Sequence, residues 1–152
     1  MPSASAALIR PARVTDAGEL AELFGQLGNP TSTEEVGANL ETRCGAGAGN
    51  ALCLVAEQDG VVGGVIVMHL LEPLHVAGRW ALVSSLVVND ALRGFGVGAA
   101  LLAEAERLAW EAGCSQVELS SSERRTRAHA FYERQGFEEV RKRLVKRRPS
   151  SC

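Results

Sequence analysis

Hydrophobic residues recur at helical spacing in two stretches near the start of the chain. Each stretch follows a polar residue that has a glutamate three positions on, which is the pattern of a capping box at a helix start. These pairs are Asp16 with Glu19 and Ser32 with Glu35. A strand-like run, Leu8 to Val14, precedes the first of them. The beginning of the chain therefore predicts one strand followed by two helices.

The middle of the chain predicts an antiparallel meander of three strands. Ala51 to Glu57 and Val61 to Leu71 are apolar runs joined across Asp59 and Gly60, and an Asp-Gly pair in that place is a strong hairpin signal. Arg79 to Val88 follows after a loop and supplies the third strand.

After Val97 the apolar spacing becomes helical again and continues to Gly113, where glycine is expected to end the helix. Val117 to Leu119 is the next strand. The handedness rule for strand–helix–strand units makes it parallel to the strand before the helix. A last helix is expected from a cap at Thr126 to Gly136.

Phe137 to Val145 is expected to be the closing strand. Together the elements predict an α/β fold with a mixed, mostly antiparallel central sheet and about four flanking helices. The length of 152 residues and the hydrophobic share of 46% predict a single domain over residues 1–152. Pro149 to Cys152 is expected to be a flexible tail.

Composition and charge narrow the function classes. With 16 basic and 18 acidic side chains the net charge is −2, which argues against a surface built for nucleic acid, although basic residues crowd the C-terminus. The 4 cysteines form no Cys-x-x-Cys pair, so the sequence predicts no metal site and a cytoplasmic protein with free thiols. The long apolar run Val61 to Leu71 is too short to span a bilayer.

The segment from Leu86 to Gly98 carries the clearest chemical signal. An apolar strand runs into Gly94, Gly96 and Gly98, which open a helix. Glycines let the backbone approach a ligand closely, and free N–H groups at a helix start attract an anion such as a phosphate. Arg93 adds a positive charge. A P-loop would need a lysine after the last glycine, and the glycine spacing does not match a dinucleotide fingerprint.

Two motifs in this order resemble the GNAT superfamily of acetyl-CoA-dependent N-acetyltransferases. The first is Arg93 to Gly98, and the second is Ala128 to Phe137, which contains Phe-Tyr-x-x-x-Gly-Phe. The resemblance covers nearly the whole chain. It implies a GNAT-like fold whose two parallel strands splay apart, acetyl-CoA as co-substrate, and transfer of an acetyl group to a primary amine by direct attack in a ternary complex.

The resemblance also implies which residues hold acetyl-CoA. The main chain of Leu86 and Val88 would bind the pantetheine arm, and an N–H of Val87 or Val88 is placed to polarise the carbonyl oxygen. The residues implied to bind the pyrophosphate through backbone amides are Arg93, Gly94, Phe95, Gly96, Val97 and Gly98. The second motif adds Ala128, Phe131 and Tyr132 to the cofactor site.

Tyr132 matches the family tyrosine that lies near the sulfur of the thioester. A phenol with a pKa of about 10 can protonate a departing thiolate whose thiol has a pKa of about 8.5. We therefore expect Tyr132 to be the general acid.

The general base is not evident. Many relatives carry a glutamate on the strand before the glycine loop, and here the equivalent positions are Ser84 and Ser85. An alkylammonium with a pKa of about 10.4 must lose a proton before it attacks. The candidates are Glu118, His69, His75, Glu72, or a water chain held by Ser84 and Ser85.

The acceptor is less well defined than the donor. By resemblance, its pocket is built from the early helices and the meander loops, at Phe24, Asn29 to Thr33, Glu72 to His75 and Trp80. The sequence leaves open a small-molecule amine or a peptide amine, and it shows no acidic cluster suited to a polycation. The alternative function is a catalytically weak CoA-binding sensor or partner-binding module. Relatives often pair their closing strands, so the resemblance also allows a homodimer.

Overall fold

The computed structural model describes residues 7–44, 49–92, 96–120, 126–140 and 144–149. The chain falls into two compact units, Met1–Leu119 and Ser120–Cys152, which are described one at a time. Among the described residues, no helix is long and apolar enough to cross a membrane.

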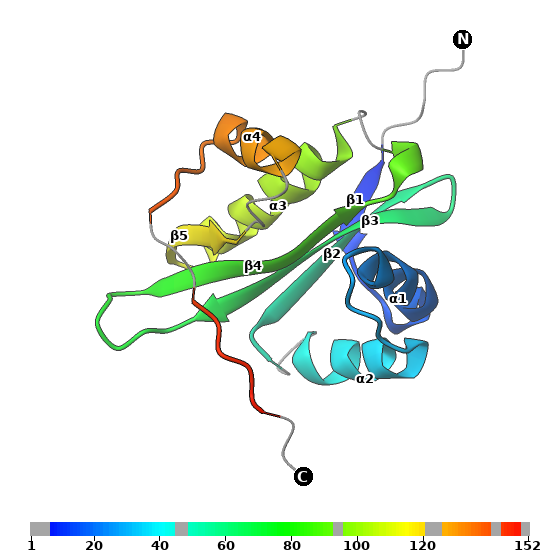
Figure 1. Cartoon of the computed structure of the whole chain (residues 1–152), viewed down its shortest axis with the longest axis horizontal. Helices are drawn as coiled ribbons and strands as arrows, with labels where there is room; N and C mark the ends of the chain where they lie inside the picture. Colours follow the sequence, from blue (N-terminus) through cyan, green and yellow to red (C-terminus); the bar gives the residue numbers. More distant parts are fainter. Residues whose placement is uncertain (1–6, 45–48, 93–95, 121–125, 141–143, 150–152) are drawn as a thin grey trace. The chain divides into compact units, whose positions relative to one another are not determined.

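The first unit is built on a five-stranded sheet whose strands lie in chain order (Figure 1). Its strands are β1 (Leu8–Pro11), β2 (Ala51–Gln58), β3 (Val61–Leu71), β4 (Arg79–Val88) and β5 (Cys114–Leu119). Neighbouring strands are antiparallel from β1 to β4, and β4 pairs with β5 in parallel. The predicted mixed, mostly antiparallel sheet with one parallel pair is confirmed.

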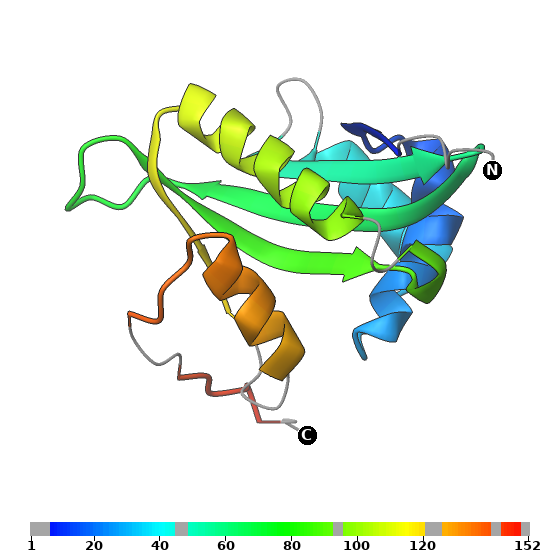
Figure 2. The ribbon, with the colours of Figure 1, turned by 90° about the horizontal axis from the view of Figure 1, so that it is seen from above.

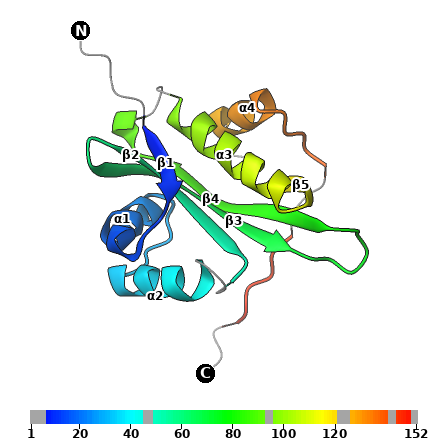
Figure 3. The same ribbon diagram turned by 180° about the vertical axis from the view of Figure 1, so that it is seen from behind.

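Helices cover both faces of this sheet. Two helices, α1 (Ala17–Gln26) and α2 (Thr33–Arg43), lie on one face, and α3 (Val97–Glu111) lies on the other (Figures 1 and 3). Figure 2 shows α3 lying along the strands and the loop between β3 and β4 extending past the end of the sheet. The face toward α1 buries Leu20, Val55 and Val65 completely.

The start of α2 follows the predicted capping pattern, because the hydroxyl of Ser32 accepts a hydrogen bond from the N–H of Glu35 at 3.1 Å. Asp16 is at the predicted N-cap position of α1, but its side chain makes no capping hydrogen bond there. The first strand stops at Pro11 rather than Val14, and a 3-10 turn, η1 (Val14–Asp16), comes next, so Asp16 already has helical backbone angles.

The carboxylates of Asp16 and Glu19 accept hydrogen bonds from groups outside α1. Asp16 accepts from the N–H of Arg13 at 2.7 Å and from the guanidinium of Arg10 at 2.8 Å, while Glu19 accepts from the N–H of Val62 at 2.9 Å. Both side chains therefore tie the start of α1 to its surroundings instead of capping it.

The hairpin between β2 and β3 forms at the predicted Asp-Gly pair. Asp59 and Gly60 both have positive φ, at 52° and 78°, which is the arrangement of a type I′ turn. This turn has the twist that adjacent antiparallel strands need, so the pair sets the start of β3 at Val61.

In the second unit, α4 spans Thr126–Arg134 and is followed by Gly136 with φ of 93°. The predicted closing strand is wrong in its described parts: residues 137–140 and 144–145 form no strand, and residues 141–143 lie outside the described residues. The N–H of Phe137 donates to the carbonyl of Tyr132 at 3.0 Å, so Phe137 completes the end of the helix. Without a paired neighbour, apolar residues alone do not make a strand.

Candidate functional site

The pairing of β3 with β4 shifts by one residue at Ser84. Val67 is opposite Ser85 and Met68 is opposite Val83, so Ser84 is the extra residue of a β-bulge. Neighbouring residues of a regular strand point to opposite faces. At this bulge, Ser84 and Ser85 both line the same pocket.

The parallel pairing of β4 with β5 ends at the same level. Its last pair in the described residues is Val83 with Leu119, whereas β4 continues to Val88. Leu86 and Val88, expected to bind the pantetheine arm, belong to this continuation and pair with Ile66 and Gly64 of β3 on their other side. The parallel strand pair expected from the resemblance is therefore present, and its splaying stays a prediction.

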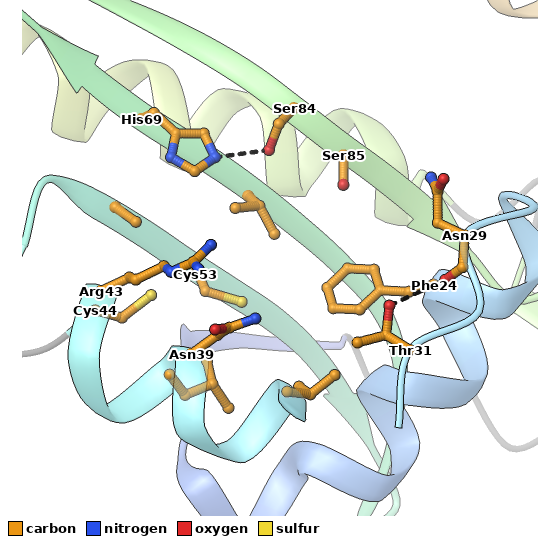
Figure 4. Close-up of a pocket in the computed structure, with 14 residues that line it drawn as sticks. Phe24, Asn29, Thr31, Asn39, Arg43, Cys44, Cys53, His69, Ser84 and Ser85 are labelled. Carbon is orange, nitrogen blue, oxygen red and sulfur yellow. Dashed lines mark hydrogen bonds between the residues drawn. The ribbon is translucent and has the colours of Figure 1, made fainter. Parts of the chain in front are cut away.

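A pocket of about 260 Å³ lies on the α1 and α2 face of the sheet, beside the bulge (Figure 4). The sheet, both helices and the connection between them contribute to it. Its lining residues are Phe24, Asn29, Thr31, Val36, Asn39, Leu40, Arg43, Cys44, Ala51, Cys53, Val67, His69, Ser84 and Ser85.

His69 and Ser84 form the one hydrogen bond that joins β3 and β4 side chains among the described pocket residues. Nε2 of His69 lies 2.8 Å from Oγ of Ser84, and Figure 4 shows the two side chains meeting across the strands. Partial burial, and secondarily the positive charge of Arg43, lower the pKa of His69. The imidazole is therefore neutral near pH 7, in the state that can accept a proton.

The other candidate bases lie outside this pocket. Glu118 is on β5 and accepts from Nε2 of Gln116 at 2.9 Å. Glu72 forms an ion pair with Arg79 at 3.1 Å beside the β3–β4 loop. His75 packs edge-on against Trp80 in the same loop region, with ring centroids 5.5 Å apart.

Only some of the predicted acceptor residues line the pocket. Phe24, Asn29 and Thr31 line the pocket, whereas the group from Glu72 to His75 and Trp80 does not. The hydroxyl of Thr31 donates to the carbonyl of Asn29 at 3.2 Å, which orders the connection between α1 and α2.

The contribution of α2 to the pocket is not among the residues predicted from the sequence. Val36, Asn39, Leu40 and Arg43 all line the pocket. Their spacing of three, four and seven residues places them on one face of a helix, and this pattern is visible in the sequence. The pocket thus has an apolar wall and one cation, and none of its described lining residues is acidic.

The glycine segment begins α3 as predicted. Gly96 precedes the first helical residue with a left-handed φ of 76°, and its carbonyl accepts from the N–H of Ala100 at 3.0 Å. Apart from its chain neighbours, no atom of the described residues lies within 4 Å of the place where a Cβ would stand on Gly96. Val97 is buried, and Gly98 is in the first turn. Arg93, Gly94 and Phe95 lie outside the described residues.

Tyr132 belongs to the second unit. It lies on α4 with Ala128 and Phe131, and spacing of three and four residues places the three on one side of the helix. Its half-buried ring makes edge contacts with Phe131 and Phe137, at centroid distances of 5.3 and 6.0 Å. The role of general acid stays a prediction.

The chain matches the model of the acetyltransferase (GNAT) family over residues 19–137. It therefore belongs to this family, whose co-substrate is acetyl-CoA. The open space at the exposed Gly96, directly before α3, fits the pyrophosphate of that co-substrate, because an anion can approach the backbone there.

The chain is 38% identical over 92 residues to an aminoalkylphosphonate N-acetyltransferase of Salmonella typhimurium. The match covers 60% of this chain and 60% of that relative.

Two solved structures share the fold over nearly all of their length. An aminoglycoside N-acetyltransferase in complex with CoA has a TM-score of 0.83 and 21% identity, and the match covers 98% of this chain and 99% of that one. A ribosomal-protein-alanine N-acetyltransferase from Brucella melitensis has a TM-score of 0.78 and 22% identity, with 93% and 99% covered. Their names indicate different acceptors, so the fold alone does not identify an acceptor.

Proposed function

We propose that the chain is an N-acetyltransferase that transfers an acetyl group from acetyl-CoA to the primary amine of a small molecule. The observation that carries this proposal is the bulge at Ser84. It coincides with the last described pair between β4 and β5 and adjoins a pocket of small-molecule size. A thioester entering along β4 and an amine held in the pocket would meet there for direct attack in a ternary complex.

Acetyl-CoA supplies an activated thioester, and the residues of the chain hold and polarise it. The main chain of Leu86 and Val88 is assigned to the pantetheine arm, and the loop that ends at Gly96 and Gly98 is assigned to the pyrophosphate. An N–H of Val87 or Val88 is assigned to the carbonyl oxygen, where charge develops during attack. Tyr132 is assigned the transfer of a proton to the departing sulfur, because it matches the tyrosine of the family motif.

We further propose that the acceptor carries an anionic group besides its amine. Support comes from Arg43, which lines the pocket while none of the described lining residues is acidic. The Salmonella relative is named for aminoalkylphosphonates, which combine an amine with an anionic phosphonate. A guanidinium suits such a group because it offers several donors in a planar fork.

The alternative is a CoA-binding sensor with little or no turnover. The observation favouring it is that Ser84 and Ser85 occupy the positions where many relatives carry a glutamate. Turnover of an amine acceptor distinguishes the N-acetyltransferase from the CoA-binding sensor.

The test combines calorimetric titration with acetyl-CoA and a free-thiol assay. The amines are an aminoalkylphosphonate, the matching amino acid, a neutral amine of equal length and a peptide with a free N-terminus. We expect binding of acetyl-CoA and turnover that is fastest with the aminoalkylphosphonate. Tyr132→Phe should lower turnover without weakening binding. Binding without turnover on any amine would support the sensor, and absence of binding would refute both functions.

A further inference from the structure

We propose that His69, acting through Ser84, takes the proton that the acceptor ammonium must lose before it attacks. This inference rests on the proposed acetyltransferase function. It assigns the general base, which the sequence leaves open. It also gives a role in proton transfer to Ser84, which stands where many relatives carry a glutamate.

The register between β3 and β4 explains how this pair arises. His69 lies on β3 opposite Leu82 of β4, so Ser84 is two residues farther along. Ser84 is therefore on the same face as His69 by ordinary strand alternation, and its Oγ lies 2.8 Å from Nε2 of His69. The bulge adds Ser85, opposite Val67, to the same face. Both side chains line the pocket, so an ammonium held there can donate to Oγ directly (Figure 4). The same bulge stands where the parallel pairing ends, which puts the proton acceptor next to the place assigned to the thioester.

The proton transfer balances without any additional reactant. In the neutral imidazole with its hydrogen on Nδ1, Nε2 accepts from the hydroxyl of Ser84. The ammonium gives a proton to Oγ of Ser84 as the serine proton moves to Nε2 of His69. The neutral amine then forms the C–N bond, the C–S bond breaks, and the second amine proton reaches the sulfur by way of Tyr132. His69 releases its proton to water after each turnover.

The charges around His69 favour its role as a proton acceptor. Arg43 at the end of α2 and partial burial both lower its pKa, which keeps it neutral at physiological pH. Burial of Cys53 and partial burial of Cys44 raise the pKa of both thiols, so neither thiol adds a charge on this side. Glu118 is two strands away on β5 and bonded to Gln116. An anionic acceptor bound by Arg43 would offset that positive charge and make His69 a stronger base.

The decisive variant is His69→Gln, because glutamine can keep a hydrogen bond to Ser84 but does not titrate near neutral pH. We expect kcat with an ordinary alkylamine to fall about 100-fold at pH 7. The remaining rate should rise with pH, since it depends on the fraction of neutral amine. A fluorinated acceptor that is already neutral at pH 7 should be acetylated at nearly the wild-type rate, because it needs no base.

His75→Gln removes the other candidate histidine, which does not line the pocket, and should keep the acidic limb of the pH profile. The control for the rate itself is Arg107→Gln, which changes a side chain on the outer side of α3 and should leave the rate unchanged. Ser84→Ala should cause a smaller loss and keep the acidic limb of the profile. Equal losses in His69→Gln with both acceptors, or an unchanged pH profile, would refute the role of His69. If the variant does not fold, the wild-type imidazole titration followed by NMR must coincide with the acidic limb of kcat, and a mismatch refutes the role. Failure of the acetyltransferase function itself would appear as no turnover by the wild type.

Discussion

Arg43 supplies the positive charge of the pocket. It is the last residue of α2 and forms no ion pair among the described residues, unlike Arg10, Arg79 and Arg107, which pair with carboxylates. A cation at a helix C-terminus is favoured by the helix dipole, so its position also stabilises α2. At the scale of single residues, this side chain is the one that would select an acceptor by charge.

We predict that Arg43→Gln raises KM for an aminoalkylphosphonate about 10-fold, since one charge-assisted hydrogen bond contributes about 1.5 kcal/mol or more. KM for a neutral amine of equal length should not change. Steady-state kinetics with both amines measure the difference. Arg107→Gln is the control, because Arg107 pairs with Glu104 on the outer side of α3. Equal changes for the two amines would contradict recognition by charge.

Between elements, the contact of α3 with β3 determines where the glycine loop meets the helix. A Cβ on Gly64 would lie 3.2 Å from side-chain atoms of both Val97 and Leu101. Val97 is the first residue of α3 and is buried, so this close approach holds the start of the helix against the sheet. The start of α3, to which we assign the pyrophosphate, therefore depends on a glycine that lies outside both sequence motifs.

We predict that Gly64→Ala lowers the free energy of unfolding by about 1 to 3 kcal/mol, because the added methyl group overpacks this contact. Acetyl-CoA affinity should fall as well, since the start of α3 moves. Thermal unfolding and calorimetry measure the two effects.

Gly25→Ala is the matched control, because Gly25 lies within α1 and no atom is within 4 Å of its Cβ position. That change should stabilise the protein by up to about 1 kcal/mol. Unchanged stability and acetyl-CoA affinity in Gly64→Ala would show that the contact has room to relax.

For the molecule as a whole, an ion-pair network fastens the first strand to the rest of the fold. Arg10 of β1 bonds to Asp16 at 2.8 Å and to Glu57 of β2 at 2.7 Å. The side chains of Arg10 and Asp16 are only 10% and 7% exposed, so loss of either partner would leave a charge nearly buried. The hydrogen bond from Arg10 is the main cause that holds the pKa of Asp16 below its ordinary value.

This network predicts how stability depends on pH. Because the folded protein depresses the pKa of Asp16, the stabilisation is complete above the ordinary carboxyl pKa of about 3.9 and is lost as pH falls through the folded value. Asp16→Asn should cost about 3 kcal/mol at pH 7 and flatten the acidic part of the stability curve. Denaturant unfolding from pH 7 to pH 2 measures both, with Glu22→Gln on the exposed side of α1 as control. A variant as acid-sensitive as the wild type would contradict this assignment.

The sequence by itself determined most elements and the family. Hydrophobic periodicity predicted β3 and β4 at their observed bounds. The Asp-Gly pair predicted the hairpin between β2 and β3. These signals succeed because periodicity, turn chemistry and capping depend on residues close together in the chain. The two acetyltransferase motifs are equally local, so the donor side of the site could be proposed before the structure was known.

Tertiary structure decided how distant residues meet. Whether Ser84 meets His69 depends on the pairing of His69 with Leu82 across two strands, because Ser84 and His69 are 15 positions apart in the chain. The side chain of Asp16 does not cap α1, because its carboxylate binds the guanidinium of Arg10 instead. The apolar run after Phe137 forms no strand in its described parts. The spacing of the residues predicts which face of α2 carries Arg43. Only the packing of α2 against the sheet makes that face a wall of the pocket. Pairing register and charge proximity arise between segments, so no local pattern determines them.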